Sequence, residues 1–328
     1  MISKIARRAG VVATISAIAA LGVTVGTVSA SQAAANKVIG VSIADQKSLF
    51  YIAAADGMKQ AAKAAGYKLV LLSADNDSSK QVNQVQNLLS QKVGAIIYTP
   101  QDNTAATAGV KLANKAKVPV VALDQKPESA GAKINTFIAT DSVKAAYTVC
   151  SWLFKQFNNS GEIAILQGPL GSTAEVQRTQ GCKKALAENP NVKDVAWQTA
   201  GWDETLAFNA SQNILTAHPN LKAIFGESDA MALGAAKAAK QAGRTGMVFA
   251  GIDGFPTMFT AIQDGLTQGT MAQQPYMMGQ LAVKNAIQIL QGKGSKIPAL
   301  QYQDAVLVNK SNVATNNPAK FYGPNATK

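Results

Sequence analysis

A regular alternation of short apolar runs with amphipathic segments constrains the fold of this chain more than any other feature of its sequence. It begins near residue 37: Val38–Ile43 and 94–98 are largely apolar and of strand length, and the stretch between them repeats Val85 and Leu88 at helical spacing. Apolar strands separated by such helices are typical of parallel sheets covered on both faces. We therefore expect an α/β protein with mostly parallel sheets.

The same pattern predicts the approximate position of each element. Strands are expected at 38–43, 68–72, 94–98, 118–123, 162–167, 192–199, 221–225, 247–252 and near 302–308. Helices are expected at 50–65, after residue 78, and at 104–117, 141–157, 172–187, 203–217, 228–242 and 275–291. The polar residues 311–328 are expected to form a frayed tail.

The two halves of the pattern repeat each other. A strand–helix–strand unit that begins at residue 95 ends at Asp124, and a unit of nearly equal length that begins at residue 223 ends at Asp253. Ligands of open α/β sheets bind outside the carboxyl ends of the strands. We therefore expect two similar lobes whose aspartates, Asp124 and Asp253, face one shared cleft.

The first 35 residues have the composition of an export signal. Three positive charges precede an apolar stretch over 11–28, and alanines between residues 30 and 35 offer cleavage points. A membrane anchor is the alternative, although polar residues such as Thr14 dilute the stretch. Arg7 and Arg8 fit a twin-arginine signal poorly. We expect export to a periplasm. Removal of the signal leaves about 295 residues, which is enough for two lobes.

The charge of the chain is basic, with a formal net charge of +12. Its lysines are scattered singly along the helical segments, which is typical of a solvated surface and not of a nucleic-acid interface. We therefore expect no nucleic-acid partner. A transcription regulator of two-lobed fold would need an N-terminal helix-turn-helix, where this chain has its export signal.

Catalytic and cofactor motifs are scarce. His218 is the only histidine, in a segment that reads as a helix-ending turn, so a Ser-His-Asp triad and a multi-histidine metal site are excluded. No glycine-rich loop for a dinucleotide or a phosphate is present. We expect no catalytic residue, cofactor or metal. The enzymatic alternative is a glycosidase that uses Asp124 and Asp253 as a carboxylate pair.

Cys150 and Cys182 are the only cysteines. Each lies in an expected helix, one before and one after the same expected strand. Export permits a disulfide between them, and two buried, unpaired thiols are the alternative. The sequence leaves both open.

Several side chains have the chemistry that binds polyhydroxy compounds. Each buried hydroxyl must both donate and accept, which planar polar side chains satisfy, while the C–H faces of a sugar pack on aromatic rings. Phe50 and Tyr51 follow the first strand, and Trp202 lies in a loop between a strand and a helix. Packing in the core or at a helix entry is the other interpretation of these aromatic residues.

These motifs, taken together, resemble those of the ribose-type periplasmic sugar-binding proteins of ABC importers. The resemblance runs in order from about residue 37 to 308 and is carried by Asp56-Gly57, 66–70, Asn87-Leu88-Leu89, 118–124, Leu166-Gln167-Gly168, 215–219, 229–234 and 251–254. It implies a monomer of two lobes that closes on its ligand by a hinge and docks on an importer permease. It also implies crossing segments near Thr140, Gln274 and Asp304.

The implied lobes combine separate stretches of the chain. The N-terminal lobe comprises 37–140 and 275–304, and the C-terminal lobe comprises 141–274 and 305–310. A receptor that reports the ligand to a membrane sensor of the chemotaxis type is a second function consistent with the same resemblance. Neighbouring genes for an importer ATPase and permease would favour uptake.

The resemblance also implies which residues bind the ligand. Residues that match the sugar contacts of the family are Phe50, Tyr51 (Phe in the family), Asp124, Arg178, Asp253 and Gln273, and Trp202 falls where the ribose proteins carry Phe. Departures are Gln125 in place of an arginine, Ser48 and Ser228 in place of asparagines, Ala44 in place of serine and Ile252 in place of phenylalanine.

These departures change the expected ligand. Several of them lose hydrogen-bonding capacity or reach, and each unpaired buried hydroxyl costs on the order of 1–3 kcal/mol, so ribose should bind poorly. Another pentose, a tetritol, a pentitol or an inositol-like ring fits better. Ser48, Gln125 and Ser228 stay in the predicted set of ligand-binding residues, and Asp45 and Lys47 are candidates for additional contacts.

Overall fold

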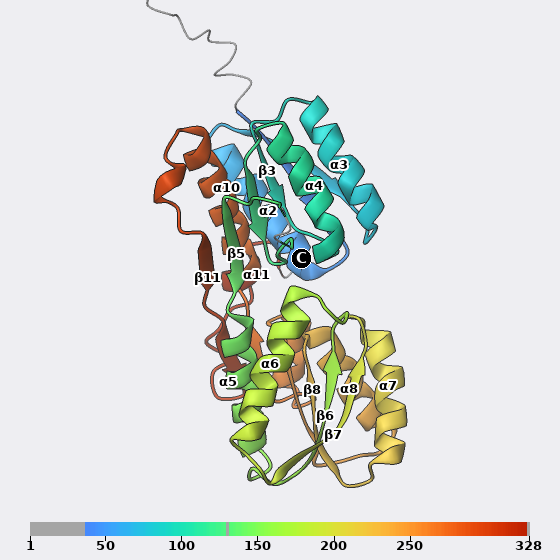
Figure 1. Cartoon of the computed structure of the whole chain (residues 1–328). Coiled ribbons are helices and arrows are strands. Elements are labelled where there is room, and N and C mark those ends of the chain that lie inside the picture. The colour runs from blue at the N-terminus through green and yellow to red at the C-terminus, as the bar shows by residue number, and fades with distance from the viewer. Residues whose placement is uncertain (1–36, 129–130, 327–328) are drawn as a thin grey trace, which may run out of the picture.

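The computed structural model describes residues 37–128 and 131–326, which form two lobes (Figure 1). The export signal expected for residues 1–35 lies outside the described residues. Within the described ranges, no helix is both long and apolar enough to cross a membrane.

The first lobe contains a six-stranded sheet in which every pair of neighbours is parallel. In spatial order its strands are β11 (Leu300–Gln303), β5 (Thr136–Thr140), β4 (Val120–Leu123), β3 (Ala95–Tyr98), β1 (Val38–Ile43) and β2 (Lys68–Ser73). Its helices pack in pairs: α2 (Leu49–Ala64) with α10 (Pro275–Leu290), and α3 (Ser78–Ser90) with α4 (Asn103–Lys115). Ile97 and Ile96 point to opposite sides, into the clusters of the first and second pair, so helices cover both faces.

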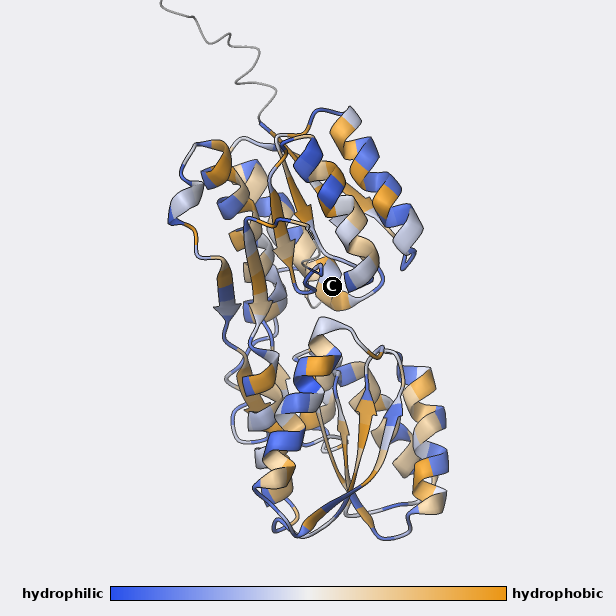
Figure 2. Cartoon of the chain, in the orientation of Figure 1, coloured by the Kyte–Doolittle hydropathy of each residue, from blue (hydrophilic) through white to orange (hydrophobic). Residues whose placement is uncertain are grey.

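The second lobe repeats this plan. Its sheet has the order β12 (Val306–Asn309), β10 (Gly269–Ala272), β9 (Val248–Asp253), β8 (Leu221–Gly226), β6 (Gly161–Gln167) and β7 (Val192–Thr199), with only β12 antiparallel to its neighbour. The helix pairs are α5 (Ser142–Lys155) with α6 (Thr173–Ala187), and α7 (Glu204–Ala217) with α8 (Asp229–Gln241). Figure 2 shows hydrophobic strands between helices of mixed character. The predicted fold class is confirmed.

Aspartates cap the start of several helices. A carboxylate oxygen accepts a hydrogen bond from the backbone N–H three residues later at Asp77, Asp102, Asp141 and Asp203. Such a cap satisfies a backbone donor that has no partner within the helix. Because each of these helices follows the carboxyl end of a strand, the caps fix the loops at the edge where ligands bind.

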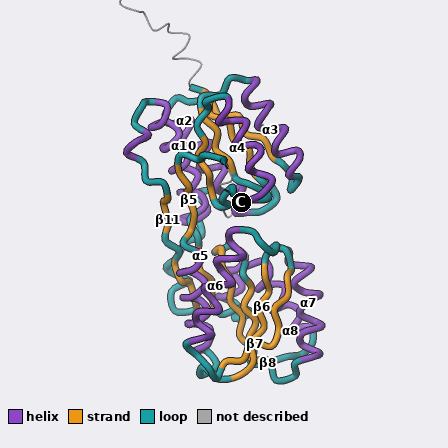
Figure 3. The backbone as a smooth tube through the Cα atoms, in the orientation of Figure 1, coloured by secondary structure: helices purple, strands orange, loops and turns teal. Residues whose placement is uncertain are grey.

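The chain passes between the lobes three times (Figure 3). It crosses between β5 and α5, between β10 and α10, and between β11 and β12. The single strand expected near 302–308 is therefore wrong, because the chain leaves the first sheet after Gln303 and enters the second at Val306. The sequence does not predict β5, β10 or α9 (Pro256–Gln263), whose segments are too short to show a clear period.

The frayed tail expected for residues 311–328 is also wrong. Val313 and Tyr322 are buried, Phe321 is fully buried, and Ala319–Tyr322 form the short helix α11. A buried aromatic side chain contributes about 1.5–3 kcal/mol, so these residues anchor an otherwise polar segment at a few points.

Cys150 on α5 and Cys182 on α6 form a disulfide. Both cysteines are fully buried in the cluster that packs these two helices against β6, β8 and β9. The bond ties two helices of the second lobe together across 32 residues of sequence.

We expect no free sulfhydryl when the denatured, unreduced protein is titrated with a thiol reagent, and two after reduction. Reduction should lower the free energy of unfolding by roughly 3–4 kcal/mol, because the bond removes loop-closure entropy from the unfolded chain. Two free thiols before reduction would show that the cysteines are unpaired in the native protein.

Candidate functional site

The residues predicted to bind a ligand lie where strands end, at the edge of each sheet that faces the other lobe. Ser48, Phe50 and Tyr51 lie at the start of α2, Asp124 and Gln125 follow β4, Arg178 is on α6, Trp202 and Ser228 precede α7 and α8, Asp253 ends β9, and Gln273 follows β10. Both lobes therefore contribute to one set of side chains.

Asp124 is the acceptor that the first lobe provides. Its Oδ2 accepts a hydrogen bond from the Tyr51 hydroxyl at 2.9 Å and a longer one from Gln125 Nε2 at 3.4 Å. Tyr51 is held edge-on to Phe50, with ring centroids 5.4 Å apart. Burial raises the pKa of Asp124, and the hydrogen bond from Tyr51 and the positive charge of Arg178 on the other lobe lower it.

Asp253 is the corresponding acceptor of the second lobe. Its Oδ1 accepts a hydrogen bond from Gln273 Nε2 at 2.8 Å and lies 3.5 Å from Arg178 Nη1, and its Oδ2 accepts from the backbone N–H of Asp229 at 3.3 Å. Burial raises the pKa of Asp253, Arg178 lowers it, and the charge of Asp124 raises it. The two aspartates thus influence each other across the cleft.

Arg178, on α6 of the second lobe, is 4% exposed. Its Nη1 donates to the carbonyl oxygen of Glu227, but its Nε is buried without a partner among the described residues. A buried donor without a partner costs free energy unless a ligand or water accepts its hydrogen bond. The guanidinium also lies over the Trp202 ring, 5.3 Å from the centroid.

Trp202 is seated against the backbone of Gly168. A Cβ at Gly168 would come within 2.1 Å of the indole, so only glycine permits this contact. Trp202, Asp124 and Asp253 all have positive backbone φ angles, of 65°, 67° and 147°. Such conformations cost non-glycine residues of order 1–3 kcal/mol and are found preferentially at functional sites.

Residues 39–294 match the family model described as the periplasmic binding protein domain. The chain belongs to the periplasmic binding protein family. It is 34% identical over 285 residues to the ribose import binding protein of Salmonella typhimurium, which covers 87% of this chain and 94% of that protein. The xylitol-binding protein of Mycolicibacterium smegmatis is 32% identical over 304 residues, 92% of this chain and 86% of that protein.

The fold of this periplasmic binding protein is similar to that of an ABC transporter solute-binding protein of Actinobacillus succinogenes, solved with bound D-allose. The TM-score is 0.81 at 31% identity, over 85% of this chain and 99% of that one. The resemblance to ribose-type proteins is thereby confirmed, and the family is one of binding proteins and not of enzymes.

A second layer of polar residues supports the cleft of this periplasmic binding protein. Fully buried Asp229 accepts hydrogen bonds from the backbone N–H groups of Gly254 and Phe255 at 2.7 and 2.8 Å and from the Thr270 hydroxyl at 2.7 Å. It thereby fixes the turn that follows Asp253. Any Cβ at Gly251 would lie 2.4 Å from Asp229 Oδ1, so this close approach requires glycine.

A second buried carboxyl, that of Glu227, holds the backbone beneath Trp202. Its Oε2 accepts from Gly168 N–H at 2.9 Å, and its Oε1 lies 2.7 Å from Thr179 Oγ1. The sequence analysis missed Glu227 and Asp229. Their only sequence signal was their position on either side of Ser228, immediately after a predicted strand.

The hydrogen bonds around Thr179 indicate that Glu227 is protonated. Thr179 Oγ1 accepts from Gln167 Nε2 at 2.8 Å and lies 2.7 and 3.0 Å from the carboxyl oxygens of Glu227 and Glu175. One hydroxyl has one proton to donate, so the second carboxyl must supply its own. Glu175 accepts from two further donors, whereas burial raises the pKa of Glu227 to about 8.

Gln125 connects the two lobes directly. Its Oε1 accepts from the backbone N–H of Thr173, at the start of α6, at 2.9 Å. The Thr173 hydroxyl also accepts from Lys126 N–H and Asn103 Nδ2 at 3.1 and 3.0 Å. The lobes are therefore in direct contact through Gln125, Lys126 and Asn103 of the first lobe and Thr173 of the second.

The two predicted serine contacts differ in their surroundings. Ser228 Oγ caps α8 by accepting from the Met231 N–H at 3.3 Å, whereas Ser48 makes no side-chain capping bond at the start of α2. The loop before α2 is shaped by Asp45, whose Oδ1 accepts from the N–H groups of Lys47 and Ser48 at 2.7 Å.

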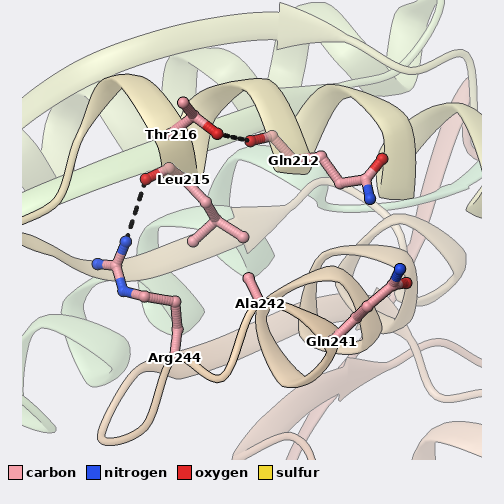
Figure 4. Close-up of a pocket in the computed structure, with 6 residues that line it drawn as sticks. All are labelled: Gln212, Leu215, Thr216, Gln241, Ala242 and Arg244. Carbon is pink, nitrogen blue, oxygen red and sulfur yellow. Dashed lines mark hydrogen bonds between the residues drawn. The ribbon is translucent and has the colours of Figure 1, made fainter.

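A hollow of about 360 Å³ lies elsewhere on the second lobe, between α7 and α8 (Figure 4). It is lined by Gln212, Leu215, Thr216, Gln241, Ala242 and Arg244. The Arg244 guanidinium donates to the carbonyls of Leu215, Pro219 and Leu221 and thereby joins chain segments. Over the described ranges, no group of three or more metal-ligating side chains is assembled.

The buried proton on Glu227 predicts a pH-dependent stability. The unfolded chain releases this proton near pH 4.5, whereas the folded protein keeps it to about pH 8. The stabilising contribution is therefore complete below pH 4.5 and is lost as the pH rises to 8, by at most about 1.4 kcal/mol per pH unit. In denaturant unfolding between pH 5 and 8, Glu227→Gln should show a shallower decline than the parent.

Glu204→Gln is the matched control, because Glu204 is a half-exposed glutamate paired with Lys237 on the surface. It should decline with pH as steeply as the parent. Equal slopes for Glu227→Gln and the parent would mean that Glu227 is ionised in the folded protein at these pH values.

Proposed function

We propose that this periplasmic binding protein captures a sugar or sugar alcohol between its lobes and delivers it to an ABC importer. The observation that carries this proposal is the combination of Asp124 and Asp253 with Arg178. The two carboxylates are hydrogen-bond acceptors, and the Nε of Arg178 is a buried donor whose hydrogen bond is still unmade within the described residues. A hydroxyl group both donates and accepts, so a polyhydroxy ligand satisfies acceptors and donor alike.

The charge of the cleft favours a neutral ligand over an anion. Arg178 already lies near Asp253 and influences Asp124, so it has no excess charge to offer a carboxylate or phosphate. An anion would face both aspartates in surroundings of low dielectric constant, where like charges repel strongly. A neutral polyol brings hydroxyl donors without adding charge.

The side chains that replace polar residues of the ribose-type site favour a ligand other than ribose. Gln125 is engaged with Thr173 of the opposite lobe, and the Ser228 hydroxyl caps its own helix. Fewer polar side chains are then available to the ligand, while the Trp202 ring offers a large apolar face. We propose a tetritol, a pentitol, an inositol-like ring or a pentose other than ribose as the ligand class.

Closure of the lobes is the step that we propose the importer permease recognises. A ligand that bonds to Asp124 and Asp253 favours the closed arrangement, because only there does it contact both lobes. The protein is proposed to act as a monomer. The same closed form would serve a chemotaxis-type sensor, and uptake measured in a strain that lacks the permease separates transport from sensing.

A thermal-shift screen over pentoses, hexoses, inositols and C4–C6 sugar alcohols should identify one compound class, with a dissociation constant of about 0.1–10 μM. At 100-fold excess over that constant, the ligand should add about 2.7 kcal/mol of stability. Asp124→Ala and Asp253→Ala should each cost about 2–4 kcal/mol of binding free energy in calorimetric titration, because a buried hydroxyl loses a charged partner.

His218→Ala is the control for these variants, since His218 ends α7 away from the cleft residues. It should bind like the parent. Thermal shifts with amino acids and none with polyols would overturn the ligand class. Unchanged binding by both aspartate variants would overturn the site.

We also propose that the chain is exported and cleaved between Ala30 and Ala35, because a charged start, an apolar stretch and small residues follow in order. Mass spectrometry of the natively secreted protein should then find a mature start within this range. An intact Met1 on the functional protein would contradict export through a cleaved signal.

A further inference from the structure

The C-terminal segment 311–326 lies at the junction of the two lobes, contrary to the expectation of a frayed tail. Figure 1 shows α11 at the level where the lobes meet. After β12 the segment buries Val313, Phe321 and Tyr322, of which Phe321 is inaccessible to solvent. These residues belong to an apolar cluster that also contains Ala53 of the first lobe and Met258 of the second.

The contacts with the second lobe are mainly aromatic. Phe321 packs on Phe259 of α9, with ring centroids 6.1 Å apart, and Tyr322 packs edge-on to Phe255 with centroids 5.8 Å apart. Phe255 follows the cleft residue Asp253 by two positions. Such aromatic pairs stabilise their arrangement beyond the area that they bury.

The contacts with the first lobe are equally specific. Helix α11 packs on α10 and α2, and the Asn325 amide donates to Asp56 Oδ2 at 3.4 Å. Gly323 is so close to Tyr276 that a Cβ there would lie 2.3 Å from the ring. Its φ of 80° belongs to the left-handed region, so glycine is required on two grounds.

One polar contact links this segment to the ligand site. The Tyr322 hydroxyl donates to the carbonyl oxygen of Asp253 at 2.9 Å, and both groups are buried. Burial raises the pKa of Tyr322 well above its usual value, so the hydroxyl keeps its proton and acts as a donor. The same carbonyl oxygen accepts a hydrogen bond from Gln273 N–H at 2.9 Å. These two hydrogen bonds hold the backbone of Asp253, which has a positive φ angle.

We infer that residues 311–326 form a strap that joins the lobes and that Tyr322 is a positioning residue for the backbone of Asp253. The second statement rests on the proposed function, because it matters for binding only if Asp253 contacts the ligand. The strap favours the closed arrangement because opening the lobes must separate it from α2 and α10 or from α9. Binding then starts from lobes that are already held near each other, and less conformational freedom is lost on capture.

Two variants test the strap and the positioning role separately. A chain that ends at Lys310 should still unfold cooperatively but have a larger radius of gyration by small-angle scattering without ligand. Should truncation abolish cooperative unfolding, Tyr322→Ala replaces it, because it removes the contacts of this ring with Phe255 and Asp253 of the second lobe. A folded variant with the parent radius of gyration would overturn the strap.

Tyr322→Phe removes only the hydroxyl. Hydrogen exchange at the amides of 253–255 should become about three- to tenfold faster, and polyol affinity should fall by a similar factor, because one buried hydrogen bond is lost. Tyr302→Phe, on exposed β11, is the matched control and should leave both unchanged. Exchange at the parent rate in Tyr322→Phe would overturn the positioning role.

These readouts are independent of the proposed function. If the parent binds none of the polyols, that function fails, while scattering and hydrogen exchange still decide the strap and the role of Tyr322. If exchange increases but affinity is unchanged, Tyr322 positions Asp253 without affecting the ligand, and the inferred link to binding is overturned.

Discussion

Arg178 is the only buried cation among the described residues, whereas the same residues include five buried carboxyl groups. The buried acids are Asp45, Glu175, Glu227, Asp229 and Asp253. One guanidinium does not neutralise them, and an uncompensated buried charge costs several kcal/mol. The cleft therefore depends on backbone N–H donors, on protonation and on the position of Arg178 itself.

Four of these five acids illustrate the three solutions. Asp229 accepts two backbone N–H groups and a hydroxyl, and Asp45 accepts two backbone N–H groups. Glu227 keeps a proton, because burial outweighs the stabilisation of its charged form by Arg178. Asp253 contacts Arg178 and Gln273. In the proposed function, the other acids support the backbone of the site, and Asp124 and Asp253 bind the ligand.

The sequence could predict the parts of this arrangement that repeat. The strand–helix alternation predicted the fold class, and the internal echo predicted that Asp124 and Asp253 come from opposite lobes, because equivalent strands end at equivalent edges. The supporting residues Glu227 and Asp229 have no such signal. Their roles depend on which backbone N–H groups lie nearby, and that is decided by packing between elements distant in sequence.

The C-terminal segment is a second case in which packing between distant elements, and not the local sequence, decides the structure. A polar composition over 311–328 predicted fraying, but Val313, Phe321 and Tyr322 anchor the segment in an apolar cluster with residues of α2 and α9. Likewise, residues 302–308 form one run in the sequence and two strands in the fold, because the connection between the lobes passes through Asp304. The local sequence pattern does not predict how such segments are positioned by contacts with distant parts of the chain.

The central claim is that one ligand joins Asp124 and Asp253 across the cleft. A double-mutant cycle of binding free energies for Asp124→Ala, Asp253→Ala and the double variant tests it most directly. If the ligand acts as a strut, losing either aspartate already loses closure. The double variant should then lose at least about 1 kcal/mol less than the sum of the single losses. Losses that add within about 0.5 kcal/mol would show two independent contacts and would contradict closure through a shared ligand.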